Sequence, residues 1–533
     1  MFGSKEKSRF LQNCHNPKTD TFNFGKIERY FLKSNKGNSA QSISDQTYHD
    51  LDMDEVYMLL DRTVSKVGQQ YLYNTFRTIP ADENRSKRFD TLIEIFRKDA
   101  PLKQTALIEL YRLRKPEAFY IATLFQEEYI QKPKWFWLIT LLSGLSFLTV
   151  LLTVFYPKFI LLLLILLAGN FAIHYWNKNN IFQYTASIPQ LLILHQVSKK
   201  LLETNAFGQT ENLKESVRCM DKLSNQMRFF QLEAKMQSDI GQAFEAVLEL
   251  IKALFLFEPI LLFHVLKKLE AHRTQMETLF TFVGEIDTVL SIEAFRNTLP
   301  YWCESEFSNG QEKYFQAIDL YHPLIPEAVS NSITLENRSA LLTGSNMSGK
   351  TTFIRTVGIN AILGQTLNFC CASNFIMPRL HIHSAIRISD NLLSEKSYYF
   401  EEVNTIKHML DASRQEHANL FLLDELFKGT NTSERIAAGK AVLGYLNQNS
   451  NFVFIATHDL ELTDYLKEEY DLYHFSETVE NGSIHFDYKL KTGNLKTTNA
   501  IRILELNNYP AEVIAEAKTV SETLQKVYDD KMH

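Results

Sequence analysis

Apolar residues follow three different patterns along this chain, and each pattern predicts a different kind of element. Two long uncharged segments, Trp135 to Tyr156 and Phe159 to Trp176, are separated only by Pro157 and Lys158. Residues 185 to 300 then place apolar positions roughly one helical turn apart, which predicts long packed helices. Beyond residue 330, apolar residues form short continuous runs, a pattern typical of buried strands. We therefore expect a helical region with an apolar hairpin, followed by an α/β domain.

The two uncharged segments are close to the length of about 20 apolar residues that a membrane-spanning helix needs. Aromatic residues stand at the segment ends, where amphipathic rings favour the lipid headgroups. Lys132, Lys134 and Lys178 flank the outer ends, against the single Lys158 in the turn. This bias predicts a multi-pass membrane protein with a two-span hairpin over residues 135–176 in the bilayer, and with both termini and the C-terminal domain cytoplasmic. The alternative is a buried hairpin in the core of a soluble helical domain.

A candidate phosphate-binding loop follows the first strand-like run. The sequence Leu341-Leu-Thr-Gly-Ser-Asn-Met-Ser-Gly-Lys-Thr-Thr352 leads from an apolar strand pattern into a helical one. Glycines allow the tight turn in which successive N–H groups point at phosphate oxygens, the lysine reaches the terminal phosphates, and the threonine hydroxyl binds Mg²⁺. The predicted nucleotide-binding residues are Gly344, Ser345, Asn346, Met347, Ser348, Gly349, Lys350, Thr351 and Thr352.

Two later strand-like runs end in residues that suit the same site. Leu420 to Leu423 is followed by Asp424, which can hold the Mg²⁺ shell together with Thr351, and by Glu425, which can orient or deprotonate the attacking water. The next run ends before His458, whose ring can hydrogen-bond a γ-phosphate or the attacking water. Alone, these are ordinary features of an acidic turn and a structural histidine; their order after the loop favours a catalytic set of Lys350, Glu425 and His458.

These motifs resemble the MutS family of DNA mismatch-repair ATPases, whose nucleotide domain belongs to the ABC class. The family's loop reads close to Thr-Gly-Pro-Asn-Met-Gly-Gly-Lys-Ser, against Thr343 to Thr351 here. Its Asp-Glu-x-Gly-Arg-Gly-Thr run is similar to Asp424 to Thr430, although Phe427 and Lys428 replace Gly-Arg. Its Ala-Thr-His-x-x-Glu-Leu-Thr segment is similar to Ala456 to Thr463.

The resemblance implies a homodimer that binds ATP and Mg²⁺ between its nucleotide domains. It also implies that Ser397 contacts the γ-phosphate in trans, since this serine falls at the spacing of the loop that reaches the partner subunit's nucleotide in the family. The departure here is Tyr398-Tyr399, where Thr-Phe is usual. Weaker matches at Leu60 to Gly68 and Gly284 to Ser291 resemble the start and end of the family's helical core.

The family's mismatch readers carry two further domains with a Phe-x-Glu wedge. Only about 50 residues precede the core match, too few for a normal domain. No Phe-x-Glu occurs in them, so we expect a membrane-anchored variant that lacks the mismatch-recognition domains.

The expected fold class is an α/β P-loop (ABC-class) ATPase domain joined to a long all-α core or lever domain that carries a transmembrane helical hairpin. Net charge is −6, which gives no global sign of a nucleic-acid binder, and the five cysteines show no metal or disulfide spacing. The expected layout is a loosely ordered tail (1–45), helical core (46–134), hairpin (135–176), second part of the core or lever (177–300), ATPase domain (301–520) and C-terminal tail (521–533).

The functional hypothesis is an ATP-dependent conformational switch of the MutS type that hydrolyses ATP in a dimer and binds DNA in mismatch repair or recombination. The alternative is a membrane-anchored ATPase whose lever motion acts on a lipid or protein partner. An ABC transporter is disfavoured, because one hairpin is too little for a permeation path and no Leu-Ser-Gly-Gly-Gln signature is present.

Overall fold

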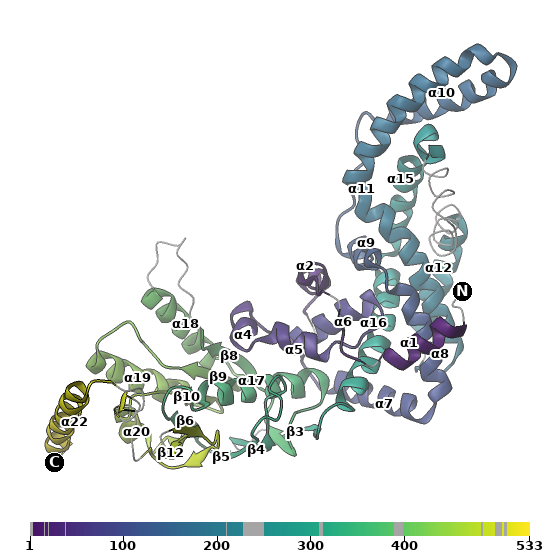
Figure 1. The fold of residues 1–533 in the computed structure, drawn as a ribbon. Helices are drawn as coiled ribbons and strands as arrows, with labels where there is room; N and C mark the ends of the chain where they lie inside the picture. The colour runs from purple at the N-terminus through teal and green to yellow at the C-terminus, as the bar shows by residue number, and fades with distance from the viewer. Residues whose placement is uncertain are drawn as a thin grey trace. The chain divides into compact units, whose positions relative to one another are not determined.

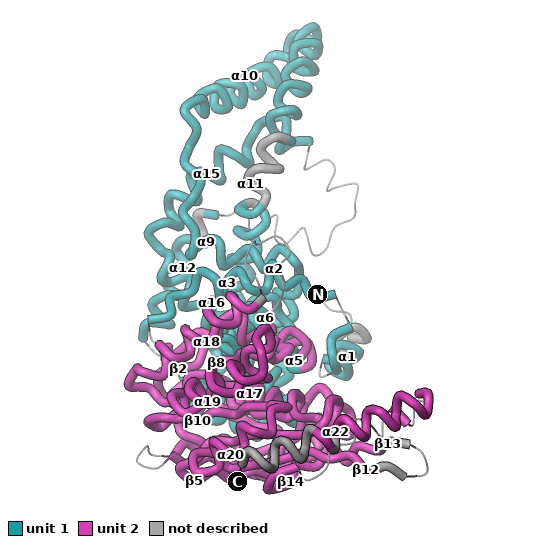
Figure 2. The backbone as a smooth tube through the Cα atoms, turned by 90° about the vertical axis from the view of Figure 1, so that its left-hand side faces the viewer, with its two compact units in different colours: residues 1–37, 60–77, 87–298 teal, residues 38–59, 78–86, 299–533 magenta. Residues whose placement is uncertain are grey.

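The structure, a computed structural model, forms two compact units that are discontinuous in sequence. It describes residues 4–532 except 15, 20, 38, 209–210, 228–249, 309–312, 388–397, 481–482, 496–500, 502–503 and 506–508. Unit 1 comprises residues 1–37, 60–77 and 87–298, and unit 2 comprises residues 38–59, 78–86 and 299–533 (Figure 2).

Unit 1 is helical throughout its described residues. Its elements are α1 (Ser4–Asn13), α2 (Phe24–Ile27), α3 (Arg29–Lys33), α6 (Lys66–Arg77), most of α7 (Asn84–Lys98), α8 (Ala100–Leu110), η1 (Tyr111–Leu113), η2 (Pro116–Tyr120), α9 (Thr123–Gln126), α10 (Phe136–Phe155), η3 (Pro157–Phe159), α11 (Ile160–Glu203), α12 (Glu211–Gln226), α15 (Phe257–Leu269), η4 (Glu270–His272) and α16 (Arg273–Arg296) (Figure 1).

The predicted apolar hairpin forms two long helices. The stretches Phe136–Phe155 and Pro157–Tyr175 are long and apolar enough to cross a membrane, with mean hydropathies of 2.3 and 1.8 and only 17% of each packed inside the protein. The second stretch does not end there, because α11 continues to Glu203 as one helix with Pro189 inside it. Helix α15 packs on the hairpin, where the rings of Phe136 and Phe263 lie 5.1 Å apart.

Part of the segment that we expected to be a loose tail is built into the fold. Its residues form α1, α2, α3 and β1, and the side chains of Ile27, Tyr30 and Phe31 are buried. Lys18 forms an ion pair with buried Asp61 at 2.8 Å. The physical reason is that aromatic residues are interspersed among the polar ones. This stretch therefore buries enough apolar surface to offset the conformational entropy that is lost when it becomes ordered.

A buried carboxylate joins the two helical segments that resemble the start and end of the family's core. Asp287 on α16 accepts hydrogen bonds from the N–H groups of Val64 and Ser65, at 2.8 and 2.7 Å, and so caps the start of α6. Gly68 lies directly against it, because a Cβ at this position would come within 2.1 Å of the Asp287 carboxylate. Burial raises the pKa of Asp287 to about 6, while these donors lower it.

Unit 2 is a mixed α/β structure. Its described sheets are a six-stranded sheet in the order β14-β11-β6-β10-β9-β8, a four-stranded sheet in the order β3-β7-β4-β5, and the pairs β1-β2 and β12-β13. The strands are β1 (Ser39–Ser42), β2 (Thr78–Pro80), β3 (Ser305–Phe307), β4 (Tyr314–Leu320), β5 (Asn331–Glu336), β6 (Ser339–Thr343), β7 (Asn374–Met377), β8 (His381–Ala385), β9 (Asn419–Asp424), β10 (Phe452–Ala456), β11 (Tyr470–His474), β12 (Glu477–Glu480), β13 (Ser483–Phe486) and β14 (Lys491–Thr492). The helices are α4 (Asp45–Asp50), α5 (Met53–Leu60), α17 (Lys350–Leu367), α18 (Tyr398–Ser413), α19 (Thr432–Leu446), α20 (Glu461–Leu466) and α22 (Ala511–Met532).

The central strands β6, β9 and β10 of the six-stranded sheet are buried on both faces, as expected of parallel strands with helical crossovers. Strands β11, β6, β10, β9 and β8 run parallel, and only β14 is antiparallel. Because side chains alternate along a strand, Phe421 and Leu423 of β9 pack in the cluster formed with α18 and α19. Leu422 faces the other way, toward Gly358 of α17, where a Cβ would come within 2.4 Å.

Unit 2 also includes residues 38–59 and 78–86, most of which we had assigned to the helical core. Asp50 shows why residues 38–59 belong here: its buried carboxylate accepts hydrogen bonds from the Ser384 hydroxyl and from the N–H groups of Ile386 and Arg387, at 2.6, 3.0 and 2.9 Å. Asp52 forms ion pairs with Arg355 and Arg387. These long-range polar contacts leave no local signature in the sequence.

Candidate functional site

Three strand ends meet at one edge of the six-stranded sheet. Ala456 at the end of β10 is paired with Leu342 of β6 and with Asp424 of β9. The Glu425 N–H donates to the Ala456 carbonyl at 2.8 Å, and the Thr457 N–H donates to Leu342 at 3.0 Å. The structure therefore brings together the loop after β6, the acids after β9 and the histidine after β10.

The loop from Gly344 to Gly349 turns tightly from β6 into α17. Gly344 and Gly349 have φ values of 149° and 109°, and Met347 also lies at positive φ. A Cβ on Gly344 would come within 2.7 Å of the Phe475 carbonyl and 2.9 Å of the Ser348 hydroxyl, so glycine is required by space as well as by conformation. The N-terminus of α17 opens on this loop, and such an end favours anions.

Lys350, the first residue of α17, turns its side chain back into the loop. Its Nζ donates to the Gly344 and Ser345 carbonyls, at 2.8 and 2.9 Å, and lies 3.4 Å from His458 Nε2. Burial lowers the pKa of Lys350, while Asp424, Glu425 and Glu477 oppose that shift. The ammonium group is therefore held in the loop beside the carboxylates.

The predicted metal ligands and catalytic residues lie in direct contact. The Thr351 hydroxyl donates to Asp424 Oδ2 at 2.8 Å. Glu425 lies 3.1 Å from His458 Nε2 and 3.3 Å from Lys428 Nζ. Burial, and next the Lys350 cation, lower the pKa of His458, while the neighbouring carboxylates raise it. A neutral imidazole can either donate or accept a hydrogen bond here.

A cavity of about 780 Å³ opens beside these groups. It is lined by Ser345 to Phe353, Asp424, Glu425, Lys428 and His458, and also by residues from elsewhere in unit 2: Leu320, His322, Ile325, Pro326, Glu327, Ala328, Val329, Asn331, Thr356, Phe475 and Tyr488. Gly344 is in the loop but not among the lining residues, and Ser397 lies outside the described residues.

Some of these lining residues were not predicted as site residues. His322 is one of them; burial and the nearby Arg355 lower its pKa to about 4, against a raising effect of Asp52. Ile325, Val329 and Tyr488 add apolar and aromatic surface to the cavity. They come from loops and a hairpin end, where no periodic pattern marks them.

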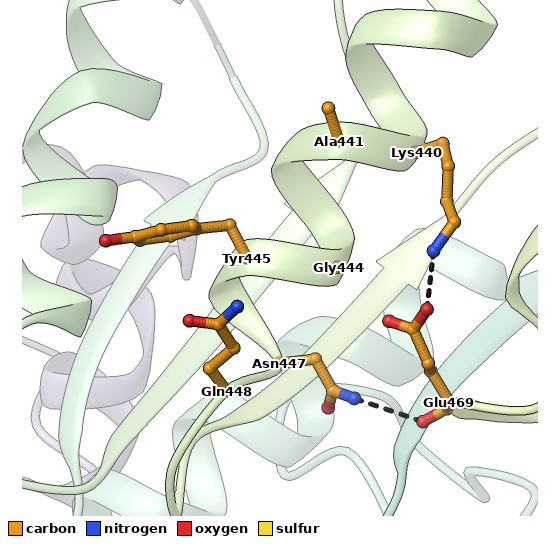
Figure 3. Close-up of a pocket in the computed structure, with 7 residues that line it drawn as sticks. All are labelled: Lys440, Ala441, Gly444, Tyr445, Asn447, Gln448 and Glu469. Carbon is orange, nitrogen blue, oxygen red and sulfur yellow. Dashed lines mark hydrogen bonds and ion pairs between the residues drawn. The ribbon is translucent and has the colours of Figure 1, made fainter.

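A second hollow of about 530 Å³ lies at the C-terminal half of α19 (Figure 3). Its polar groups bind each other: Lys440 forms an ion pair with Glu469, and the Asn447 side-chain amide donates to the Glu469 carbonyl at 3.2 Å. It holds none of the predicted site residues, so the strand-end cavity is the stronger nucleotide site.

Comparison with known proteins agrees with the motifs at this site. Residues 340–525 match the family described as MutS domain V. Over these residues the chain resembles that domain. It is similar to proteins named DNA mismatch repair protein MutS: from Aquifex pyrophilus, 29% identical over 46% of this chain and 29% of the relative; from Listeria monocytogenes serotype 4b (strain CLIP80459), 33% identical over 39% and 25%; and from Geobacillus sp. (strain WCH70), 26% identical over 57% and 36%.

These matches show a similarity to MutS proteins that is confined to part of the chain. The matched regions span between 25% and 36% of the length of these three relatives. The similarity covers the candidate site after β6, β9 and β10, whereas the roles of individual residues, the ligands, the dimer and the membrane hairpin have to be argued from this chain.

Proposed function

We propose that this chain is a Mg²⁺-dependent ATPase that works as a conformational switch of the MutS type. The observation that carries the proposal is the meeting of Lys350, Thr351, Asp424, Glu425 and His458 at one sheet edge beside a cavity of about 780 Å³. A triphosphate fits the chemistry of this edge, because a helix N-terminus, backbone N–H groups and a lysine converge there.

Each group has a role that its position supports. Loop N–H groups and Lys350 bind the phosphates, and Ile325, Val329 and Tyr488 offer an apolar surface for the base. Water attacks the γ-phosphorus while Glu425 accepts its proton; the bond from the γ-phosphorus to the bridging oxygen breaks, giving ADP and phosphate. His458, 3.1 Å from Glu425, orients that carboxylate and the water.

The Thr351 and Asp424 oxygens suit Mg²⁺, which prefers oxygen ligands and usually keeps few protein ligands beside the phosphates. Bound there, Mg²⁺ would neutralise charge on the phosphate oxygens. The 2.8 Å hydrogen bond between these two residues supports the assignment, because two ligands of one ion lie side by side.

What the switch acts on is the second part of the proposal. The names of the relatives favour DNA as the partner. The motif resemblance adds a homodimer in which Ser397 of one subunit reaches the nucleotide of the other. A different observation favours a membrane machine: α10 and the first part of α11 expose apolar side chains along their length, including Leu148 at 53% and Leu161 at 67%. We propose a membrane-tethered switch with DNA as its first candidate partner.

The test of the ATPase uses purified detergent-solubilised protein and three variants. Lys350→Ala should weaken ATP binding at least tenfold, because it removes the ammonium group that the Gly344 and Ser345 carbonyls hold inside the loop. Glu425→Gln should bind ATP normally and slow turnover by about 10²-fold or more. Lys440→Ala, in the second hollow, is the matched control and should behave like the wild type. ATP affinity unchanged in Lys350→Ala, or full turnover in Glu425→Gln, would contradict the assignment.

A further inference from the structure

The turn after the candidate base has an unusual backbone. Glu425 and Phe427 both have a φ of 57°, in the left-handed region that costs an ordinary residue about 1–2 kcal/mol. Phe427 also stands where the resembled family has glycine, the residue that adopts this conformation freely. Something outside the turn must therefore hold it.

The first turn and a half of α18 supplies that support. The Glu402 side chain is fully buried, and its Oε1 accepts a hydrogen bond from the Phe427 N–H. Tyr399, one turn earlier, places its ring centroid 6.3 Å from that of Phe427. The same tyrosine lies so close to Gly429 that a Cβ there would come within 3.1 Å of it. Helix α18 thus contacts the turn at Phe427 and at Gly429.

Charge and burial make the Glu402 contact specific. Burial raises the pKa of Glu402, while the backbone N–H groups of Phe427 and Lys428 and the Lys428 cation lower it. A carboxylate that accepts backbone hydrogen bonds in a buried place is costly to remove, because the N–H that it serves is left without an acceptor.

The direction of the Glu425 side chain depends on this turn. Its carboxylate is placed between His458 Nε2 and Lys428 Nζ, at 3.1 and 3.3 Å, and Lys428 is itself part of the turn. If Phe427 relaxes to negative φ, the Glu425 and Lys428 positions both change. We infer that Glu402 is a positioning residue for ATP hydrolysis, which fixes the left-handed turn and through it the orientation of Glu425. This inference rests on the proposed ATPase function.

The experiment compares Glu402→Ala with Glu402→Gln, whose amide oxygen can still accept the Phe427 N–H. In Glu402→Ala, kcat should fall by about 10–100-fold, because a small displacement of a catalytic group has effects of this size. ATP affinity should stay within about twofold, because the loop and Lys350 are untouched. Glu402→Gln should keep most of kcat, and Lys407→Ala, exposed on the same helix, should match the wild type.

A second variant tests the conformational argument itself. Phe427→Gly relieves the left-handed strain, so Glu402→Ala/Phe427→Gly should recover part of the kcat lost in Glu402→Ala. Hydrogen exchange, measured without nucleotide, should show the Phe427 amide exchanging faster in Glu402→Ala and at the wild-type rate in Glu402→Gln.

The outcomes separate this inference from the function on which it rests. A wild-type kcat in Glu402→Ala overturns the inference. A joint fall of kcat, ATP affinity and melting temperature in Glu402→Ala that also occurs in Glu402→Gln overturns it too, because the role is then purely structural. If the wild type hydrolyses no ATP and Lys350→Ala binds nucleotide normally, the proposed function fails and the catalytic role of Glu402 fails with it. The exchange measurement then still decides whether Glu402 holds the turn.

Discussion

At the residue scale, unit 2 contains a buried cation that is bound by neutral oxygens. Lys313 is 8% exposed, and its Nζ lies 2.6 Å from Asn447 Oδ1 and 3.3 Å from the Ser339 hydroxyl. Its charge also faces the ring of Phe452. Burial lowers the pKa of Lys313 to about 8, because the neutral oxygens that it contacts do not offset the lost hydration.

This residue predicts a pH dependence of stability. Below pH 8 Lys313 is protonated in both the folded and the unfolded state, and the cost of burying its charge is fully present. Between about pH 8 and the unfolded pKa of about 10.4, only the unfolded state keeps the proton, so folding becomes more favourable by up to about 3 kcal/mol. Lys313→Met should remove this gain.

The measurement is the free energy of unfolding in urea for wild type and Lys313→Met at pH 7 and pH 10. Taking the difference between the two proteins cancels the other titrating groups. Lys440→Met, which is half-buried in the adjacent hollow, is the control and should show a smaller pH effect. If the difference in unfolding free energy between wild type and Lys313→Met is the same at pH 7 and pH 10, the prediction is refuted.

At the scale of elements, helices α6 and α16 pack together with very little free space between them. The Asp287 carboxylate serves the start of α6, and Arg62 N–H donates to the Ser291 hydroxyl at 2.8 Å one turn further along α16. Gly284 packs against Tyr71, where a Cβ would come within 2.5 Å. Close approach of the two helices therefore depends on Gly68 and Gly284.

We predict that Gly68→Ala destabilises unit 1 by about 1–3 kcal/mol or more, because its Cβ would overlap the Asp287 carboxylate and disturb its hydrogen bonds. Gly144→Ala is the matched control: it adds the same methyl group inside α10, where nothing lies within 4 Å. The midpoint of thermal unfolding, followed by circular dichroism, should fall for Gly68→Ala and stay for Gly144→Ala. Equal midpoints for the two variants would show that the close approach is unimportant.

At the scale of the whole molecule, the open question is where the apolar hairpin lies. Its helices are long and apolar enough to span a bilayer. Leu256, at the start of α15, packs against Phe136 and Ile139 of α10. Each side chain left exposed along α10 costs free energy in water and none in a bilayer.

We predict that the protein stays with membranes through alkaline carbonate extraction. A double substitution, Leu148→Arg and Ile165→Arg, places one charge on the exposed side of each span near its centre and should release the protein, because a charge at a span centre costs about 2.5–3.5 kcal/mol. Leu32→Arg is the control, since Leu32 is 60% exposed outside the hairpin. Release of the wild type by carbonate would exclude the two-span arrangement.

The sequence by itself determined the kind of elements and the nucleotide motif. Continuous apolar runs marked β6, β9 and β10, and parallel strands place their carboxyl ends at one edge, so the meeting of Lys350, Asp424 and His458 followed from their order alone. The mixed α/β unit and the helical unit are confirmed, and the predicted resemblance to MutS agrees with the match over residues 340–525. The individual site residues, Ser397 and the domain boundaries stay predictions.

Only the tertiary structure decided which distant segments complete each unit. Residues 38–59 join unit 2 through Asp50 and Asp52, and the cavity gains Ile325, Val329 and Tyr488 from separate loops. Glu402 reaches the turn at Phe427 in the same way. The physical reason is that periodicity reports how a segment meets its immediate surroundings, whereas a single long-range hydrogen bond or a loop side chain has no period to read.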